Sequence, residues 1–193
     1  MNVLLVAAVD AELSDLGGVP VGVGPLRAAH RAGMMFATNR PDAVVLVGSC
    51  GSYTPEIGIG DVVCSQTNLW ASGVDALGLG YTPIPPPALP ADAALIAASG
   101  LVVARVVTVP TITTDLTLAA ALTQLGEVEH MEAYGVALAA AEAQIPFLAI
   151  LGVSNQVGPG AHEDWKRHRA TAEANAREAA RRLVHKLSHQ DRP

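Results

Sequence analysis

Apolar runs of strand length alternate along this chain with segments of helical periodicity or composition. The apolar runs predict strands at residues 2–9, 19–24, 42–48, 61–70, 101–109, 127–131 and 146–153. Helices are predicted between them, after Pro25, over residues 91–99, 113–125 and 132–144, and from near His162 onward. Strands that are apolar throughout are typical of sheets covered on both faces. The alternation therefore predicts one α/β domain over residues 1–193, with a mostly parallel or mixed sheet between layers of helices.

Three segments depart from this simple alternation. Residues 71–91 are rich in proline and predict an irregular flap or interface loop, because so long a block without regular structure is unusual inside a compact domain. Thr113 or Thr114 is the predicted N-cap of the helix that follows. The final helix keeps apolar residues at helical spacing as far as Leu187, and the polar residues after Leu187 are predicted to fray.

The composition is that of a globular domain with a substantial core. Of 193 residues, 50% are hydrophobic and 16% are charged, which excludes an intrinsically disordered chain. The formal net charge is −6 and no basic patch with interleaved aromatic residues occurs, so no nucleic-acid partner is expected. The N-terminus lacks the basic region of a signal peptide, and no apolar run reaches the roughly 18 residues that span a membrane. Cys50 and Cys64 lack metal-binding spacing and are expected to be reduced thiols of a cytoplasmic protein.

Polar or glycine-rich residues follow five of the predicted strands. Ligands of such sheets bind at strand ends, so these tips form the candidate site. The tips are residues 10–12, 22–24, 48–53, 129–132 and 154–155. Each also has an ordinary structural explanation: Glu12 suits a helix N-terminus, residues 22–24 suit a tight turn, and Ser154-Asn155 suits a loop turn.

Familiar metal and nucleophile motifs do not fit the sequence. Ser49 lacks the G-x-S-x-G spacing, and residues 130–134, HMEAY, do not match H-E-x-x-H, so neither a metal nor another cofactor is predicted. Cys50 has no neighbouring base in sequence and is expected to be a packed thiol. Trp165 is interpreted first as a core anchor for the final helix.

The order of these segments is more specific than any one of them. The distinctive stretches are AVDAE, VGVGPLRAA, VVLVGSCGSYTPEIGIGDVV, VVTVPTITTD, EHMEAYGVALAAAEAQIPFLAI and GVSNQVGP. Over nearly its whole length the chain resembles the nucleoside phosphorylase/nucleosidase superfamily. The resemblance implies a three-layer sandwich with a central mixed, mostly parallel sheet flanked by helices. It also implies a purine nucleoside as ligand and a homo-oligomer, a dimer or higher.

Within that superfamily the sequence is most similar to the futalosine hydrolases, which release hypoxanthine from futalosine in the alternative menaquinone pathway. Asn155 stands where methylthioadenosine/S-adenosylhomocysteine nucleosidases carry aspartate, and Trp165 follows at the interval usual in futalosine hydrolases. The VTV of RVVTVPTITTD also resembles their V-N-T-V segment. An amide NH₂ suits the N7 and O6 acceptors of hypoxanthine, and an amide can also pair with adenine.

The resemblance implies a role for each site residue, with water as the nucleophile. Glu12 orients and deprotonates that water. Glu132 binds the ribose hydroxyls beside the developing positive charge. Asn155 directs its amide N–H groups toward N7 and O6 of the leaving purine, and Ser154 supports the loop. The other implied members of the pocket wall are Ser49, Gly51, Tyr53 and Met131.

Three alternatives are left open by the sequence. One is a methylthioadenosine/S-adenosylhomocysteine nucleosidase. The second is a purine nucleoside phosphorylase, although Leu46 stands where hexameric phosphorylases carry a phosphate-binding arginine, which favours water. Leu151 likewise stands where related hydrolases place an arginine at the water site, so a different water site is expected. The third is a non-catalytic purine-nucleoside binder, which the retention of Glu12 and Glu132 argues against.

Overall fold

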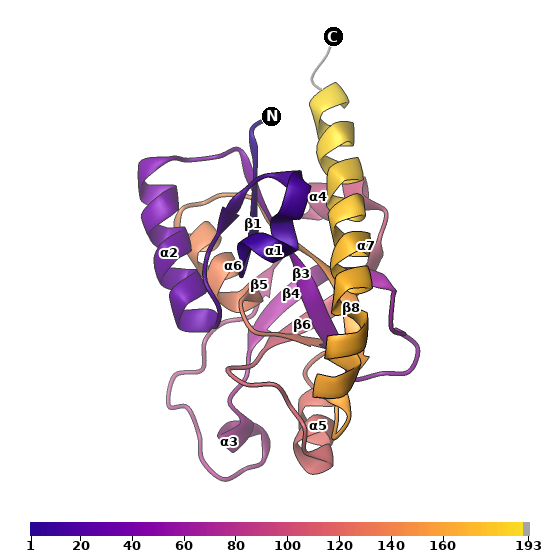
Figure 1. Cartoon of the computed structure of the whole chain (residues 1–193). Helices are drawn as coiled ribbons and strands as arrows, with labels where there is room; N and C mark the ends of the chain where they lie inside the picture. Colours follow the sequence, from indigo (N-terminus) through magenta and orange to yellow (C-terminus); the bar gives the residue numbers. More distant parts are fainter. Residues whose placement is uncertain (191–193) are drawn as a thin grey trace.

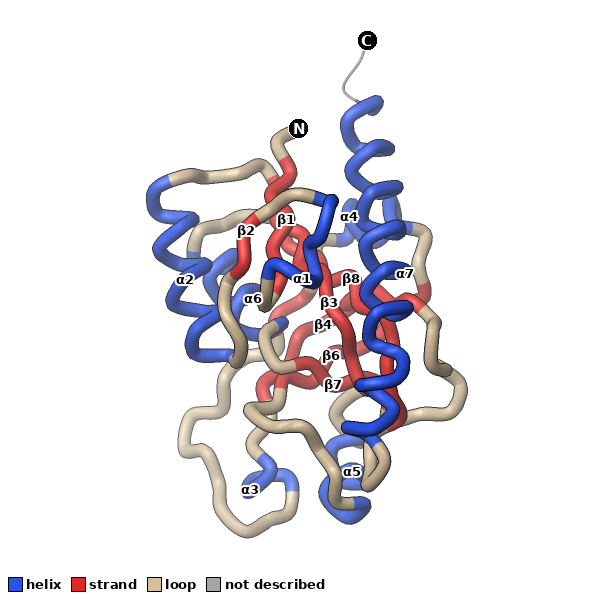
Figure 2. Tube along the Cα trace, viewed as in Figure 1, coloured by secondary structure: helices blue, strands red, loops and turns tan. Residues whose placement is uncertain are grey.

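The computed structural model describes residues 1–190 and contains an eight-stranded mixed sheet (Figures 1 and 2). The strand order is β2-β1-β3-β7-β6-β4-β5, and β8 pairs with both β3 and β4. Five strand pairs are parallel and three are antiparallel, which confirms the predicted mixed, mostly parallel sheet. The strands are β1 (Val3–Ala7), β2 (Val19–Pro20), β3 (Ala43–Ser52), β4 (Val62–Trp70), β5 (Leu89–Pro90), β6 (Val102–Thr108), β7 (Val128–His130) and β8 (Phe147–Gln156).

Five of these strands close into a ring. β3 pairs with β8, β8 with β4, β4 with β6, β6 with β7, and β7 returns to β3. The ring closes at Gly51, which is opposite Glu129 on β7 and also opposite Asn155 on β8. Three predicted strand tips that are far apart in sequence therefore meet at one glycine.

Helices cover both faces of the sheet. α2 (Pro25–Thr38) packs against α6 (Ala133–Glu142) on one face, while α7 (Ala161–Gln190) and α4 (Ala93–Ser99) cover the other (Figure 1). The result is the predicted three-layer sandwich. The shorter helical segments are α1 (Asp10–Leu13), the 3₁₀ turn η1 (Ser14–Leu16), α3 (Gly73–Ala76) and α5 (Leu116–Thr123).

The central strand β3 is buried from both sides. Val44 and Leu46 pack into a cluster with α2 and α6, whereas Val45 and Val47 pack into a second cluster with α4 and α7. All four side chains are completely inaccessible to solvent. Because successive strand residues point to opposite faces, a strand between two helical layers needs apolar residues at every position. This explains the uninterrupted apolar run in the sequence.

Small residues bring α7 close to β8. A Cβ on Gly152 would overlap the backbone carbonyl of Ala172, so only glycine fits at this crossing. Ala172, Ala176 and Ala180 are fully buried along the same face of α7. A chain with 4% aromatic residues thus fills its core by close approach of backbones rather than by large side chains.

Two predicted helix ends were wrong. α5 is capped by Asp115, whose Oδ1 accepts a hydrogen bond of 2.8 Å from the Leu118 N–H, and neither Thr113 nor Thr114 caps it. The helix begins at Leu116, one residue later than a Thr114 cap would require and two later than a Thr113 cap. α7 also continues in regular form through Gln190, so the fraying predicted after Leu187 is absent over residues 188–190; the rest of that predicted tail, residues 191–193, lies outside the described residues.

Two other regions refine the sequence prediction. Residues 71–91 contain α3 and the two-residue β5 and otherwise form loop, in agreement with the predicted irregular segment. β8 was predicted to end at residue 153, but it continues through Gln156 and so includes Ser154 and Asn155.

Among the helices described, none combines the length and apolar character that crossing a bilayer requires.

Candidate active site

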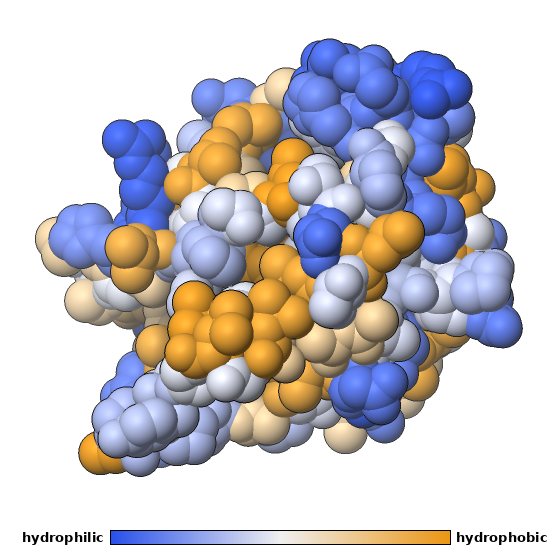
Figure 3. All heavy atoms as spheres, turned by 90° about the horizontal axis from the view of Figure 1, so that it is seen from below, coloured by the Kyte–Doolittle hydropathy of each residue, from blue (hydrophilic) through white to orange (hydrophobic). Residues whose placement is uncertain are grey.

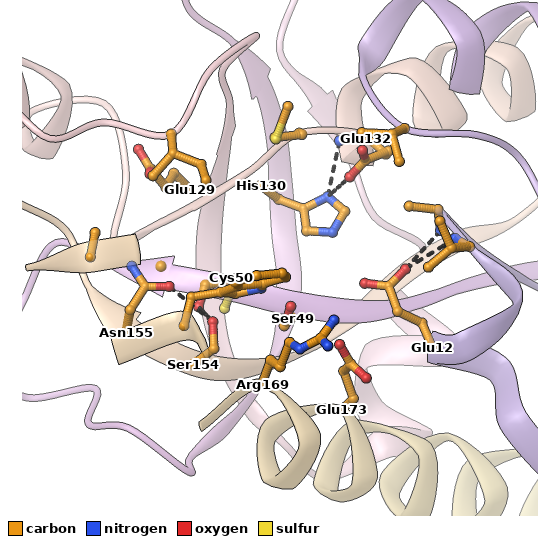
Figure 4. A pocket seen from close by; sticks show the side chains of 18 of the residues that line it. Glu12, Ser49, Cys50, Glu129, His130, Glu132, Ser154, Asn155, Arg169 and Glu173 are labelled. Atoms are coloured by element: carbon orange, nitrogen blue, oxygen red, sulfur yellow. Dashed lines mark hydrogen bonds and ion pairs between the residues drawn. The ribbon is translucent and has the colours of Figure 1, made fainter. Parts of the chain in front are cut away.

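The ends of β1, β3, β7 and β8 surround a cavity of about 400 Å³ (Figure 4). This volume suits a small molecule, since ligand pockets commonly measure about 300–1,000 Å³. All five predicted strand tips contribute to the lining. Seven of the eight predicted site residues line the cavity: Glu12, Ser49, Gly51, Met131, Glu132, Ser154 and Asn155.

Glu12 is held by the turn between β1 and α1. Its Oε2 accepts hydrogen bonds from the backbone N–H groups of Ala8 (3.0 Å) and Val9 (3.3 Å). The residue is buried, and burial raises its pKa to about 7, with smaller contributions in the same direction from Glu132 and Glu173. A carboxyl group with such a pKa exchanges protons readily at neutral pH, which suits a general base.

Glu132 joins two of the predicted tips. It sits at the N-cap position of α6, and its Oε1 accepts a hydrogen bond of 2.7 Å from the Gly24 N–H. The glycine segment before α2 is thus a tight turn, with Gly22 and Gly24 at positive φ. The Gly24 N–H of this turn donates to the Glu132 carboxylate and not to a ligand. The contact fixes Glu132 beside the cavity.

His130 is buried next to Glu132 in its neutral form. Its Nδ1 accepts hydrogen bonds of 3.1 Å from the backbone N–H groups of Glu132 and Ala133, so Nδ1 carries no proton. Burial also lowers the pKa of His130. The 3.4 Å approach of Glu132 Oε2 to Nδ1 is therefore not an ion pair. The ring proton must lie on Nε2.

Ser154 and Asn155 owe their positions to a β-bulge in β8. The pairing with β3 runs from Cys50 opposite Val153 directly to Gly51 opposite Asn155, so Ser154 is the extra residue. Bulges commonly re-aim side chains next to active sites. Both residues remain in the strand, and both line the cavity.

The bulge also sets the orientation of the Asn155 amide. Ser154 Oγ lies 2.9 Å from Asn155 Oδ1 and 3.1 Å from the carbonyl oxygen of Cys50, and its hydroxyl proton bonds to one of these acceptors at a time. Asn155 Nδ2 donates to the Gln156 carbonyl at 3.2 Å. One N–H of the Asn155 amide therefore remains for a ligand, whereas the family resemblance implied two such bonds to the purine. A Cβ on Gly51 would lie 2.9 Å from Nδ2, so this glycine keeps space for the amide.

Tyr53, the eighth predicted residue, does not line the cavity. Its hydroxyl donates a 2.7 Å hydrogen bond to Glu129 Oε2, while Glu129 Oε1 accepts from the Thr113 N–H at 3.1 Å. Burial raises the pKa of Glu129. Tyr53 therefore stands behind the pocket wall and orients Glu129, a lining residue that the sequence comparison did not select.

α7 lines one side of the cavity with side chains that were not among the predicted site residues. Trp165 lines the cavity and is only half-buried, so its interpretation as a core anchor was wrong. The guanidinium of Arg169 lies 4.7 Å from the centre of the Trp165 ring, a cation–π contact. Glu173 follows one turn later, and burial raises its pKa. The spacing of four residues between these side chains was the available signal, because it places them on one helix face.

The two leucines at the expected arginine positions belong to the core. Leu46 and Leu151 are completely buried in the cluster under α2 and α6, and neither lines the cavity. Neither side chain offers a polar group to the site. Neither position therefore contributes a cationic side chain to the cavity.

Solved structures of nucleosidases have the same fold. A methylthioadenosine/S-adenosylhomocysteine nucleosidase from Colwellia psychrerythraea, solved with adenine, superposes with a TM-score of 0.86 over 97% of this chain and 96% of that one, at 21% identity. A futalosine hydrolase mutant from Helicobacter pylori gives a TM-score of 0.85 over 96% and 99%, at 14% identity. At these identities the likeness defines the class of fold, a nucleosidase-like α/β sandwich.

Sequence comparison defines the family more closely. The family model described as the phosphorylase superfamily matches residues 16–188. The futalosine hydrolase of Streptomyces coelicolor is 34% identical over 163 residues, which span 75% of this chain and 69% of that protein. The chain belongs to the phosphorylase superfamily.

Proposed function

We propose that this protein hydrolyses the N-glycosidic bond of futalosine and releases hypoxanthine. The observation that carries the proposal is the convergence of Glu12, Glu132 and Asn155 on one cavity. They provide a base for water, a carboxylate for the ribose and an amide for the purine. The 34% identity to a futalosine hydrolase supports the choice of substrate.

The carboxylates suit the charge that develops on the sugar. Cleavage of an N-glycosidic bond passes through an oxocarbenium-like state, with positive charge on the ribose and negative charge on the leaving base. Glu132 is fixed by its bond to Gly24, so it needs no reorganisation to accept the ribose hydroxyls. Glu12 takes the proton of the attacking water, a role supported by its pKa of about 7.

The amide suits the leaving base. The bond between Ser154 Oγ and Asn155 Oδ1 favours an orientation in which Nδ2 directs its free N–H toward the ligand. We assign that N–H to N7 of the purine, where it stabilises the negative charge as the glycosidic bond breaks. Hypoxanthine can accept such a bond at N7 or at O6.

Water is a better-supported nucleophile than phosphate. Arg169 is the single lysine or arginine among the lining residues of the described chain, and it lies over Trp165 with Glu173 beside it. Phosphate sites normally combine several cationic or N–H donors. Leu46, at the position of the phosphorylase arginine, is part of the core. These features support hydrolysis over phosphorolysis.

Product chromatography tests the proposal. Purified protein is incubated with futalosine in phosphate-free buffer and in buffer with phosphate, and in parallel with methylthioadenosine. We expect hypoxanthine from futalosine at the same rate in both buffers. Strict dependence on phosphate would instead identify a phosphorylase. Release of adenine from methylthioadenosine alone would identify the other nucleosidase, and tight binding without turnover would identify a binding protein.

We further propose that the protein is a cytoplasmic homo-oligomer, a dimer or higher. Figure 3 shows hydrophobic side chains gathered on the end of the molecule that carries α3 and α5. In residues 71–91, Leu79, Tyr81 and Ile84 are each more than three-quarters exposed, which is costly for a monomer in water. Both cysteines are free thiols, which fits a reducing compartment. Light scattering after size-exclusion chromatography tests the assembly, and a monomer at micromolar concentration would contradict it.

A further inference from the structure

Within residues 1–190, two polar atoms beside Gly48 have no hydrogen-bond partner: His130 Nε2 and Glu12 Oε1. A Cβ built on Gly48 would lie 3.1 Å from His130 Nε2 and 3.2 Å from Glu12 Oε1, so both atoms lie close to the same point of β3, and both residues line the cavity. Within residues 1–190, the Glu12 side chain makes its hydrogen bonds through Oε2 and the His130 ring makes its own through Nδ1. Figure 4 shows both side chains directed into the cavity from different elements.

The two atoms have complementary hydrogen-bonding characters. The backbone bonds to Nδ1 hold His130 in the tautomer with its proton on Nε2, so this atom can only donate. An ionised Glu12 can only accept through Oε1. A single water molecule between them would accept from His130 through one lone pair and donate to Glu12. Its second lone pair would then remain free for attack.

We propose that His130 Nε2–H holds the attacking water against Glu12, because Leu151 stands at the position where an arginine was expected for this role. The inference rests on the proposed hydrolysis and explains how the reaction proceeds although Leu151 is buried in the core. The water oxygen bonds to C1′ of the ribose while the C1′–N9 bond breaks, and the electron pair of that bond leaves with the purine. Glu12 takes the proton of the water, the purine gains a proton from solvent, and His130 remains neutral throughout.

Replacement of His130 by asparagine separates this role from a structural one. The asparagine Oδ1 lies near the position of Nδ1 and can accept from the same backbone N–H groups, but nothing replaces the Nε2–H donor. We expect kcat for futalosine to fall about 10- to 100-fold with KM nearly unchanged, the scale on which one misplaced reacting group acts. His130→Gln, which returns an N–H donor farther along the side chain, is expected to recover part of kcat. His30→Asn, on the exposed surface of α2, is the matched control and should keep full activity.

A second variant tests the same space without changing His130. Gly48→Ala places a methyl group 3.1 Å from His130 Nε2 and 3.2 Å from Glu12 Oε1, where it crowds the water that both atoms would hold, and it should lower kcat by a similar factor while KM stays close to that of wild type. In water–methanol mixtures, both variants should also change the ratio of methyl riboside to free sugar, because that ratio reports how the nucleophile is held.

The outcomes distinguish this inference from the proposed function. If the wild-type protein hydrolyses futalosine and both variants keep its kcat and its methanol ratio, the role of His130 is wrong and the function stands. If the wild-type protein hydrolyses no purine nucleoside, both the proposed function and the proposed role of His130 are wrong. If His130→Asn does not fold, Gly48→Ala decides the matter alone.

Discussion

Replacement of Glu12 by glutamine is predicted to abolish most activity and, at alkaline pH, to stabilise the protein. Glutamine has nearly the same shape and can still accept the backbone N–H bonds of Ala8 and Val9 through its carbonyl oxygen. It cannot take a proton from water. Loss of a general base typically lowers kcat by about 10²- to 10⁴-fold, and KM should change little because the ligand contacts survive.

The stability effect follows from the pKa of Glu12. Burial raises this pKa from 4.5 to about 7, which corresponds to roughly 3 kcal/mol. Because the folded-state pKa is the higher one, the protonated carboxyl stabilises the fold fully below pH 4.5, and that contribution is lost as the pH rises through 7. Glutamine is neutral at every pH. The variant should therefore exceed wild type by up to about 3 kcal/mol near pH 8 and by almost nothing near pH 4.

The assay combines kinetics with unfolding at several pH values. A difference of about 3 kcal/mol corresponds to a rise in Tm of roughly 6–12 °C for a domain of this size. In wild type, kcat/KM should fall about tenfold per pH unit below the pKa of Glu12. Glu163→Gln, an exposed change on α7, is the control and should alter neither property. A Glu12→Gln enzyme with wild-type kcat, or a Tm difference that is the same at pH 4 and pH 8, would refute the reasoning.

Four other substitutions test the site and the packing. Asn155→Asp should shift the ratio of kcat/KM for methylthioadenosine over futalosine upward by at least about tenfold, because a protonated acid suits adenine; an unchanged ratio would contradict the assigned base contact. Ser154→Ala should raise KM for futalosine about tenfold, since loss of one hydrogen bond worth roughly 1.4 kcal/mol frees the Asn155 amide. Gly152→Ala should lower the free energy of unfolding in urea by about 2–4 kcal/mol, because the methyl overlaps the Ala172 carbonyl. Gly33→Ala, at an open position of α2, should instead stabilise by about 0.5–1 kcal/mol, and equal effects at the two glycines would disprove the packing argument.

Most of the predicted site could be found from the sequence because its residues follow the apolar runs that predict strands. An apolar run of this length predicts a strand, and the polar residue after the run is then expected at the edge of the sheet. Glu12, Ser49, Glu132 and Asn155 were all selected in this way, and the structure brings them together. The resemblance to a known superfamily added their roles.

The residues that were missed or misplaced depend on contacts across the fold. Trp165 and Arg169 lie on a helix whose period indicates one apolar stripe, and the pattern does not tell whether the stripe faces a core or a cavity. Tyr53 lies two residues beyond Gly51 on the chain, yet it reaches Glu129 rather than the pocket because β3 pairs with β7 there. Neither outcome follows from local sequence.

The sequence by itself determined the alternation of strands and helices, the burial of the sheet on both faces and the polar character of the strand tips. Periodicity and residue type act locally, so they can be read along the chain. Only the tertiary structure decided the ring closure at Gly51, the bulge that turns Ser154 and Asn155 toward the cavity, and the single tautomer of His130. Each of these depends on hydrogen bonds whose geometry is set when separate strands or a strand and a helix come together, and that is why the chemistry of the water site emerged only with the fold.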